Sequence, residues 1–306
     1  MKSRFFFLII KFTRGNSSRS GLMRSSVKFC VSIVAGVVLS CSSTKKAVHQ
    51  YSVDSKFEVA YSVKFVEDTT SMTMGREDVF NLMIGDNYSY GYSYIDFFKD
   101  SLAQTPLGMY TLSQSLLESY ETGISFWSSS LGGARLYKNH NEQKLSVIDN
   151  ISTYRFIYEE DIIPQSWIIQ EDTVTIAGYS SQKAVCHWRG RDWVAWFTTE
   201  LPISEGPWKF HGLPGLIVRL YDTKHHYEFE LVSFKKNNAT IDIQPLHTGE
   251  IRQLIFKYAL TKIDRKTFLG MKFGERGHII READMARIGL TADWVELKYG
   301  YIELDY

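Results

Sequence analysis

Proline and cysteine are both scarce in this chain, whose 306 residues include six prolines and three cysteines. Cys30 falls within an N-terminal leader and Cys41 directly follows it, so the body of the protein keeps Cys186 alone. A lone cysteine excludes an internal disulfide framework. His187 follows it, but adjacent side chains of a strand point to opposite faces. We therefore predict a buried structural thiol at Cys186 and not a thiol nucleophile.

An excess of charge of one sign is lacking too, since the net charge of the whole chain is only +1. That balance conceals an asymmetry, because the first 40 residues contain seven basic residues and no acidic one. Of the 35 basic residues, 28 remain beyond residue 40, against 34 acidic ones. The body is therefore mildly acidic, which removes the electrostatic basis for binding nucleic acid.

Motifs that characterise a catalytic or cofactor chemistry are missing as well. The sequence has no glycine-rich phosphate loop, no zinc-protease helix motif and no nucleophile elbow. The contiguous acids at 159–161 are typical of a solvated edge rather than of a general acid/base pair. A metal site is conceivable only if the sheet brought together two of the histidines His187, His211, His225, His226 and His247. We predict no catalytic residue, no cofactor and no metal site.

The basic leader has the features of an export signal. Arg24 and Lys28 precede an apolar run over 29–39, which is short for a membrane span and suits a signal-peptide core. Ser40-Cys41 resembles the cleavage box of bacterial lipoproteins, with Cys41 as the lipidated residue, although Leu39 stands where a small residue is usual. We predict a signal peptide over 1–40, with Met23 as an alternative start, and a tether over 41–50. Ordinary signal cleavage and an uncleaved anchor stay open.

Aromatic residues are abundant, with 18 Tyr, 19 Phe and 7 Trp, and they favour strands. Residues 57–65 alternate between apolar and polar, which is typical of a half-buried strand. A turn at 85–87 predicts a hairpin with a tyrosine row at Tyr88, Tyr90, Tyr92 and Tyr94, which either packs on the sheet or forms a wall for stacking a ligand. Further strands are predicted over 154–158, 167–169, 184–188, 193–198, 216–221, 227–231 and 240–243.

Helical spacing is confined to a few segments. Thr105-Pro106 predicts the start of a helix over about 106–120, and the spacing of apolar residues predicts helices over 251–259 and 281–288. Alternation over 301–305 predicts a closing edge strand. The fold class is therefore mostly β (α+β). We expect a single domain over 51–306, built on a large twisted antiparallel sheet that is either open or curled into a half-open barrel.

One segment, residues 206–217, has a tightly prescribed backbone. Three of the six prolines, Pro202, Pro207 and Pro214, lie within thirteen residues here. Pro214 followed by Gly215 predicts a type II turn, in which the glycine takes a positive φ and resists replacement. The residues predicted to shape this backbone are Gly206, Pro207, Gly212, Leu213, Pro214, Gly215, Leu216 and Ile217.

With these residues in view, the chain resembles the GLPGLI family of Bacteroidota envelope proteins. The match is literal over 212–217, dense over 178–222, and extends to 82–85 and 302–304. The resemblance implies a β-rich envelope domain with a secretion or lipoprotein signal. It carries no catalytic residue over to this chain, because none is established for the family.

The candidate binding residues cluster around the same segment: Trp193, Trp196, Trp208, Phe210 and His211. Their aromatic rings predict an aromatic core, a wall of an apolar pocket, or an exposed docking loop for another protein. We predict a non-enzymatic lipoprotein that binds a partner protein or an apolar ligand. A hydrolase of envelope material and a metal-binding accessory protein are the alternatives. The expected location is the outer membrane, facing the periplasm, or else the periplasm or the medium.

Overall fold

A computed structural model describes residues 52–68, 73–74, 77–122, 131, 133–151, 154–236, 238, 240–242, 260–273 and 301–305. The predicted signal peptide, Cys41, the tether and the helices predicted over 251–259 and 281–288 lie outside these residues. Within the part of the chain that the structure describes, no helix is both long enough and apolar enough to cross a membrane.

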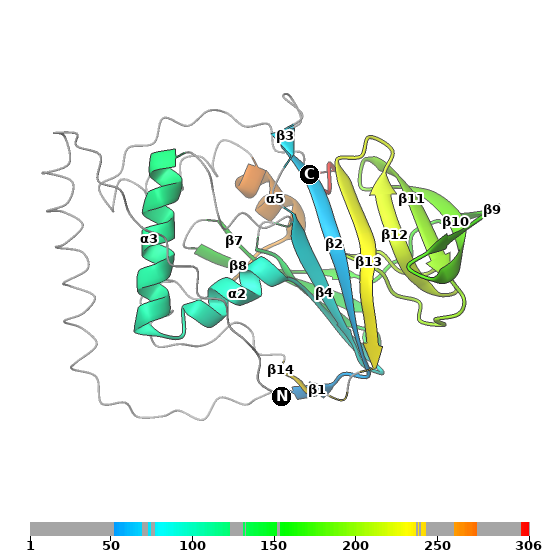
Figure 1. The fold of residues 1–306 in the computed structure, drawn as a ribbon, viewed down its shortest axis with the longest axis horizontal. Helices are drawn as coiled ribbons and strands as arrows, with labels where there is room; N and C mark the ends of the chain where they lie inside the picture. The colour runs from blue at the N-terminus through cyan, green and yellow to red at the C-terminus, as the bar shows by residue number, and fades with distance from the viewer. Residues whose placement is uncertain are drawn as a thin grey trace, which may run out of the picture. The chain divides into compact units, whose positions relative to one another are not determined.

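Strands dominate the described residues (Figure 1). They are β1 (Ser52–Asp54), β2 (Phe57–Asp68), β3 (Thr73–Met74), β4 (Asp78–Ile84), β5 (Tyr88–Ser93), β6 (Arg135–Asn139), β7 (Lys144–Ile151), β8 (Tyr154–Asp161), β9 (Ile168–Ile176), β10 (Tyr179–Trp188), β11 (Arg191–Thr198), β12 (Leu216–Asp222), β13 (Tyr227–Lys236), β14 (Thr240–Asp242) and β15 (Thr261–Lys262). The described helices are α2 (Tyr94–Leu102), α3 (Pro106–Thr122) and α5 (Arg265–Phe273).

One large sheet organises the fold and confirms the mostly β class. Its strand order is β15-β8-β7-β6-β5-β4-β2-β13-β12-β11-β10-β9, with β3 paired to β2 beside this path. The sheet is open rather than barrel-like, because β15 and β9 are its two ends. All neighbours are antiparallel except β15 and β8, which are parallel. β1 and β14 form a separate two-stranded sheet.

The predicted hairpins are present. β4 and β5 pair around the turn at 85–87, and β12 and β13 pair around 223–226. Three tyrosines of the predicted row, Tyr88, Tyr90 and Tyr92, lie on β5, whereas Tyr94 is the first residue of α2. Tyr90 stacks on Tyr92 and on Tyr137 of β6, with ring centroids 4.9 and 4.7 Å apart, so these rings pack along the sheet.

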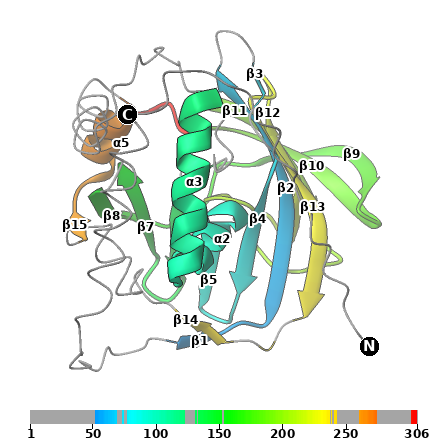
Figure 2. The same ribbon diagram turned by 60° about the vertical axis from the view of Figure 1, so that its left-hand side comes forward.

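The helices lie beside the sheet (Figure 2). α2 packs on β4 and β5, α3 packs against α2, and α5 packs against β8. The helix predicted over 106–120 is confirmed as α3, and the Thr105 hydroxyl accepts a hydrogen bond from the Gly108 amide at its start. α2 and α5 are not predicted by the sequence analysis.

The Gly206–Ile217 segment folds back over the sheet and inserts its aromatic residues into the core. Trp208 and Phe210 are fully buried, and the Phe210 ring lies 4.7 Å from that of Trp193. Glu205 and His211 form an isolated antiparallel bridge that closes the base of the segment. Tyr61 of β2 donates a hydrogen bond to the Ile217 carbonyl at 2.9 Å, which fixes the far end of the segment.

The type II turn predicted at 213–216 is wrong. Gly215 is absent from the positive-φ residues, whereas Gly212 has φ +93° and Trp208 has φ +56°. Glycine is required at 215 for a different reason: a Cβ there would overlap the carbonyl oxygen of Thr198. The backbone is therefore prescribed by close approach of two chain segments at Gly215, and by left-handed conformations earlier in the segment.

The closing strand predicted over 301–305 is also wrong, since these residues have no strand structure. The segment lies against the turn between β10 and β11, where the Leu304 amide donates to the Arg189 carbonyl at 2.9 Å. Its apolar–polar alternation does not match burial, because Ile302 and the charged Glu303 are both fully buried while the apolar Leu304 is exposed. Cys186 is a buried free thiol, as predicted, and burial raises its pKa to about 12.

Candidate functional site

A cavity of about 400 Å³ opens where four stretches of chain meet. They are the end of β8 with the loop after it, the turn between β10 and β11, the Gly206–Ile217 segment, and Asp305 near the carboxyl end of the chain; Lys138 of β6 and Leu145 of β7 add to these four. Its lining residues are Lys138, Leu145, Glu160, Asp161, Ile162, Ile163, Gln165, His187, Trp188, Arg189, Gly190, Lys209, His211 and Asp305. Nine of these fourteen residues are polar or charged, while apolar atoms supply slightly more than half of the exposed surface of the lining.

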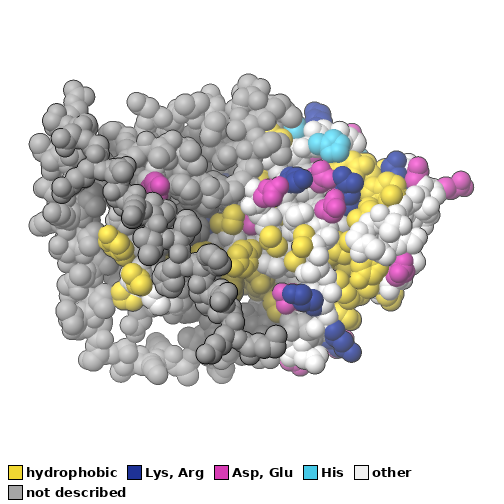
Figure 3. All heavy atoms as spheres, in the orientation of Figure 1, with side chains coloured by type: hydrophobic (Ala, Val, Ile, Leu, Met, Phe, Trp, Pro, Cys, Tyr) yellow, Lys and Arg dark blue, Asp and Glu magenta, His cyan; other side chains and the backbone are white. Residues whose placement is uncertain are grey.

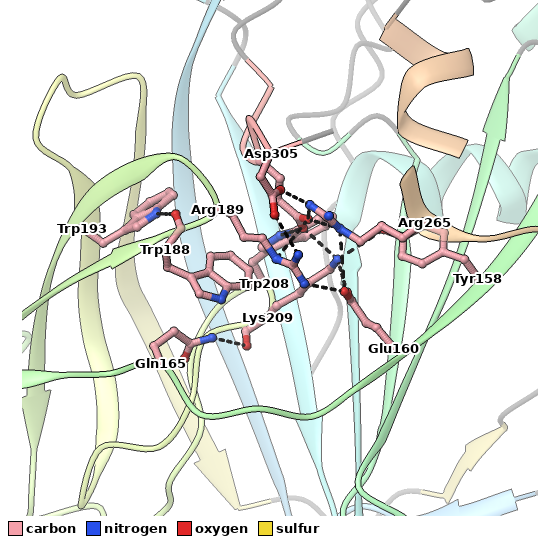
Figure 4. Close-up of polar contacts among 11 residues, drawn as sticks. Tyr158, Glu160, Gln165, Trp188, Arg189, Trp193, Trp208, Lys209, Arg265 and Asp305 are labelled. Atoms are coloured by element: carbon pink, nitrogen blue, oxygen red, sulfur yellow. Dashed lines mark hydrogen bonds and ion pairs between the residues drawn. The ribbon is translucent and has the colours of Figure 1, made fainter. Parts of the chain in front are cut away.

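Four of the lining residues belong to a group of six ionised residues, which we call the Glu303 cluster: Lys209, Arg189, Arg265, Glu160, Glu303 and Asp305 (Figure 4, which labels all of them but Glu303). Glu303 is fully buried at its centre. One carboxylate oxygen accepts from Lys209 Nζ at 2.8 Å and from the Trp208 indole at 3.0 Å, and the other accepts from Arg265 Nε at 2.8 Å. Burial disfavours the charged form of Glu303, but Lys209 and Arg265 outweigh it and lower its pKa.

The outer carboxylates complete the cluster. Arg189 donates to Glu160 at 2.7 Å and to Asp305 at 2.9 Å, and Lys209 also pairs with Glu160. Burial opposes ionisation of Asp305, yet hydrogen bonds from Arg265 and Arg189 lower its pKa. Three cations thus face three carboxylates. The expectation that Glu160 belongs to a solvated acidic edge is wrong, because its side chain is largely buried against these cations.

A second charged group, the Glu205 cluster, consists of Glu205, Lys138, His140 and Ser89. Glu205 is buried and accepts from Lys138 Nζ at 2.6 Å and from the Ser89 hydroxyl at 2.8 Å. His140 Nε2 lies 2.8 Å from the same carboxylate. Burial raises the pKa of Glu205, but Lys138 and His140 more than offset this and lower it to about 2. Lys138 reaches from this cluster to the cavity wall.

His211 lines the cavity and is 8% exposed. Its Nδ1 is 3.0 Å from the Lys209 carbonyl, and its backbone amide donates to Gln165 at 3.0 Å. Nε2 has no hydrogen-bond partner among the described residues. Burial, followed by the nearby charge of Lys138, lowers the pKa of His211 to about 4, so the ring is neutral near pH 7.

The five candidate binding residues do not converge on one site. Trp193, Trp208 and Phe210 are fully buried, so the idea of a docking loop with exposed Trp208 and Phe210 is wrong. Trp196 lies apart from them, in a groove of about 680 Å³ that Arg219, Tyr221 and Glu230 also line. Of the five, His211 alone lines the cavity described above.

His187 lines the same cavity as His211, whereas His225 and His226 do not line it. His225 stacks on Tyr221 with ring centroids 4.8 Å apart, and His226 contacts Arg191 at 3.1 Å. Among the described residues, no group of three or more His, Cys, Asp and Glu side chains is arranged to hold a metal ion.

The sheet face over β2 and β13 carries side chains of both signs (Figure 3). Lys64 lies opposite Glu228 in the register of these two strands, and Glu58 lies opposite Lys235. Pairs of opposite charge across neighbouring strands stabilise a sheet modestly. The charges on this face therefore stabilise the pairing of β2 and β13 and do not form a patch of one sign.

Four central residues of the two clusters are missed by the sequence reading: Lys138, Glu205, Arg265 and Glu303. A signal for two of the charged residues was present. Lys209 stands between Trp208 and Phe210, and Glu303 stands between Ile302 and Leu304. A charge inside an apolar run is costly to bury unless it is paired, so each of these positions indicates a partner elsewhere in the chain.

Comparisons with known proteins are sparse. The solved structures that resemble the chain include PNGF-II in the P21 space group, at 16% identity and a TM-score of 0.46, covering 71% of this chain and 33% of that one. PNGF-II in the C2 space group matches at 15% identity and a TM-score of 0.42, over 71% of this chain and 32% of that one. The chain thus spans about a third of the length of these proteins. No curated protein matches it. Residues 190–219, which include β11 and the Gly206–Ile217 segment, match the model of a family described as "Protein of unknown function (Porph_ging)".

Proposed function

We propose that this chain is a GLPGLI-type envelope lipoprotein that binds a small polar ligand in the cavity beside the Glu303 cluster. The proposal keeps the expectation of a non-enzymatic binding protein and changes the class of ligand. An apolar ligand would cover the charged side chains of the wall and displace the water that hydrates them without replacing its hydrogen bonds, which is unfavourable.

The observation that carries the proposal is the composition of the cavity wall. It holds three cationic side chains (Lys138, Arg189, Lys209) and three anionic ones (Glu160, Asp161, Asp305). Trp188 and Ile163 supply apolar surface on the same wall. A wall with matched charges and some apolar area favours a ligand that is polar and carries no net charge.

Binding is favoured over catalysis by the state of the nearby carboxylates. Glu303, Asp305 and Glu205 all have lowered pKa values because cations face them. A general acid at neutral pH needs a raised pKa instead. These carboxylates are therefore suited to holding the cavity wall in place and to accepting hydrogen bonds.

Blocking the cavity tests the proposal. Ile163 is 69% exposed and lines the cavity, so Ile163→Trp fills its mouth without disturbing the core. Ile168, 66% exposed on β9 and outside the cavity, provides the matched control Ile168→Trp. Thermal unfolding is followed with a library of saccharides, polyols and small amides, and with fatty acids as the apolar comparison. We expect polar compounds to raise the Tm of the wild type and of Ile168→Trp but not of Ile163→Trp. Stabilisation by fatty acids alone contradicts the proposal.

The envelope anchor is tested separately. If Cys41 is lipidated, a cell expressing the full chain incorporates labelled palmitate into the wild type and not into Cys41→Ala. The matched control is Cys186→Ala, which removes the buried thiol of the body. Equal labelling of wild type and Cys41→Ala would exclude a lipid anchor at this residue.

A further inference from the structure

We infer that the cavity recognises a neutral group that both donates and accepts a hydrogen bond, a carboxamide or a hydroxyl, through His211 Nε2 and Lys138 Nζ. The inference rests on the proposed function, because it specifies what the same cavity binds. It depends on one buried acceptor without a hydrogen-bond partner among the described residues, His211 Nε2, and on one ammonium group, Lys138 Nζ, whose three donors are not all used.

The first atom is Nε2 of His211. Nδ1 lies 3.0 Å from a carbonyl oxygen, which can only accept, so Nδ1 carries the proton of the neutral ring. Nε2 then presents a lone pair. It is buried and has no partner among the described residues, although it belongs to a residue that lines the cavity. An unsatisfied buried acceptor costs free energy, and a ligand that donates an N–H or O–H group removes that cost.

The second atom is Nζ of Lys138, whose side chain is 2% exposed and also lines the cavity. An ammonium group has three donors. One is taken by Glu205 at 2.6 Å, and the Phe210 carbonyl lies at 3.5 Å, the outer limit for a hydrogen bond. At least one donor is thus available to a ligand oxygen.

These two atoms lie near each other. Both residues line the cavity, and Lys138 Nζ lies 3.5 Å from the carbonyl oxygen of Phe210, the residue that directly precedes His211. The cavity therefore presents an acceptor beside a donor. A carboxamide matches both with its N–H and its C=O, and a hydroxyl matches both with a single oxygen.

Charged groups fit the pair less well. A carboxylate would place its oxygens against the lone pair of Nε2, which repels them. An ammonium group would satisfy Nε2 but would be repelled by Lys138. Because Lys138 is paired with Glu205, the ammonium group also has little excess positive charge with which to attract an anion from a distance. The match is therefore to a neutral group.

A fragment series tests this on the full chain. The probes are acetamide, acetone, acetate and methylammonium, which share a similar size and differ in charge and hydrogen-bonding groups. The readout is the ¹⁵N resonance of His211 Nε2 in protein labelled at histidine nitrogen. We expect acetamide to shift this resonance saturably and to bind at least about tenfold more tightly than acetone, which accepts but cannot donate. Ethanol, as a hydroxyl probe, separates the hydroxyl from the carboxamide.

Equal binding of acetone and acetamide overturns the inference while leaving a ligand-binding cavity, as does preferred binding of acetate or methylammonium. If no fragment binds but larger polar compounds stabilise the wild type, the donor–acceptor pair is refuted and the proposed function stands. If none of the polar compounds binds either, both fail.

Variants provide an independent arm. His211→Asn keeps an amide donor near the Lys209 carbonyl and removes Nε2, so acetamide binding, followed by ligand-observed NMR, should weaken by about tenfold. The control His225→Asn changes an exposed histidine in the turn between β12 and β13 and should bind like the wild type. Thermal unfolding verifies that both variants are folded. Unchanged acetamide binding by folded His211→Asn contradicts the inference.

Discussion

Two buried glutamates, Glu205 and Glu303, are both stabilised in the charged form by cations, but the cations are arranged differently. Each is almost inaccessible to water, and each has its pKa lowered by a lysine that lies within 3 Å. Glu205 is the only carboxylate that pairs with Lys138 among the described residues. Glu303 shares its cations, because Lys209 also pairs with Glu160, and Arg265 also pairs with Asp305.

The difference teaches that burial alone does not determine how much a charged residue matters. Removing Glu205 leaves Lys138 buried without a counter-charge, whereas removing Glu303 leaves each of its cations with another carboxylate. The free energy of unfolding should therefore fall more for Glu205 than for Glu303, although Glu303 makes more contacts.

The largest effect is expected for Glu205→Gln. It leaves the Lys138 ammonium buried and unpaired, and breaking a buried pair in this way costs about 3–5 kcal/mol. Chemical denaturation measures the change in the free energy of unfolding. Glu171→Gln, at an exposed position on β9, is the matched control and should be nearly neutral. A loss below about 1 kcal/mol for Glu205→Gln would show that water or a rearranged side chain compensates Lys138.

The next effect is acid sensitivity that depends on Glu205. Its folded pKa is lowered from 4.5 to about 2, so its contribution to stability is present above pH 4.5 and is lost as the pH falls through about 2. That shift corresponds to about 3 kcal/mol. Denaturation between about pH 5 and pH 2 should therefore show a steeper loss of stability for the wild type than for Glu205→Gln. Parallel profiles would refute the lowered pKa.

Glu303→Gln is expected to cost less, about 1.5–3 kcal/mol, which is the range for hydrogen bonds to charged groups. The amide oxygen can still accept from the Trp208 indole, and Lys209 and Arg265 keep Glu160 and Asp305. Denaturation under the conditions used for Glu205→Gln gives a direct comparison. If Glu303→Gln is the more destabilising of the two, Glu160 and Asp305 do not compensate the charges of Lys209 and Arg265, and the expected order of the two variants is wrong.

The smallest effect is expected for Ser89→Ala, about 1–2 kcal/mol. It removes one hydrogen bond of 2.8 Å to Glu205 while Lys138 and His140 stay in place. Ser180→Ala, at an exposed position on β10, is the control. Measured in both the wild type and Glu205→Gln, Ser89→Ala should be almost neutral in the second background, because its partner has lost the charge.

Local patterns account for the parts of the fold that could be predicted. The β4–β5 and β12–β13 hairpins are specified by alternation and by a turn within a few residues, so the sequence contains both determinants in one place. β6 and β7 were missed because charged residues occupy buried positions in them. Lys138 and Asp149 are paired with Glu205 and Lys272, which lie 67 and 123 residues away.

The candidate site was predicted only in part for the same reason. His211 was singled out because it stands in a conspicuous segment, yet its importance comes from Lys209, Gln165 and Lys138 around it. Glu160 looked like one acid of an exposed run, and only the fold brings Lys209 and Arg189 to it. Residues that pair over such long stretches of chain follow no regular spacing, so a single sequence does not reveal which residues are partners.

The adjacency of β2 and β13 determines when the sheet can be completed. These neighbours join two runs of strands, β4 to β8 and β9 to β12, and their paired residues Ser62 and Glu230 are 168 residues apart. A chain that emerges at about 5–20 residues per second delivers β13 roughly 10–30 s after β2. During that interval one edge of β2 has no partner strand, and an unpaired edge is a template for association with other chains. Because of this strand order, the free edge of β2 needs protection from association with other chains until β13 has been synthesised.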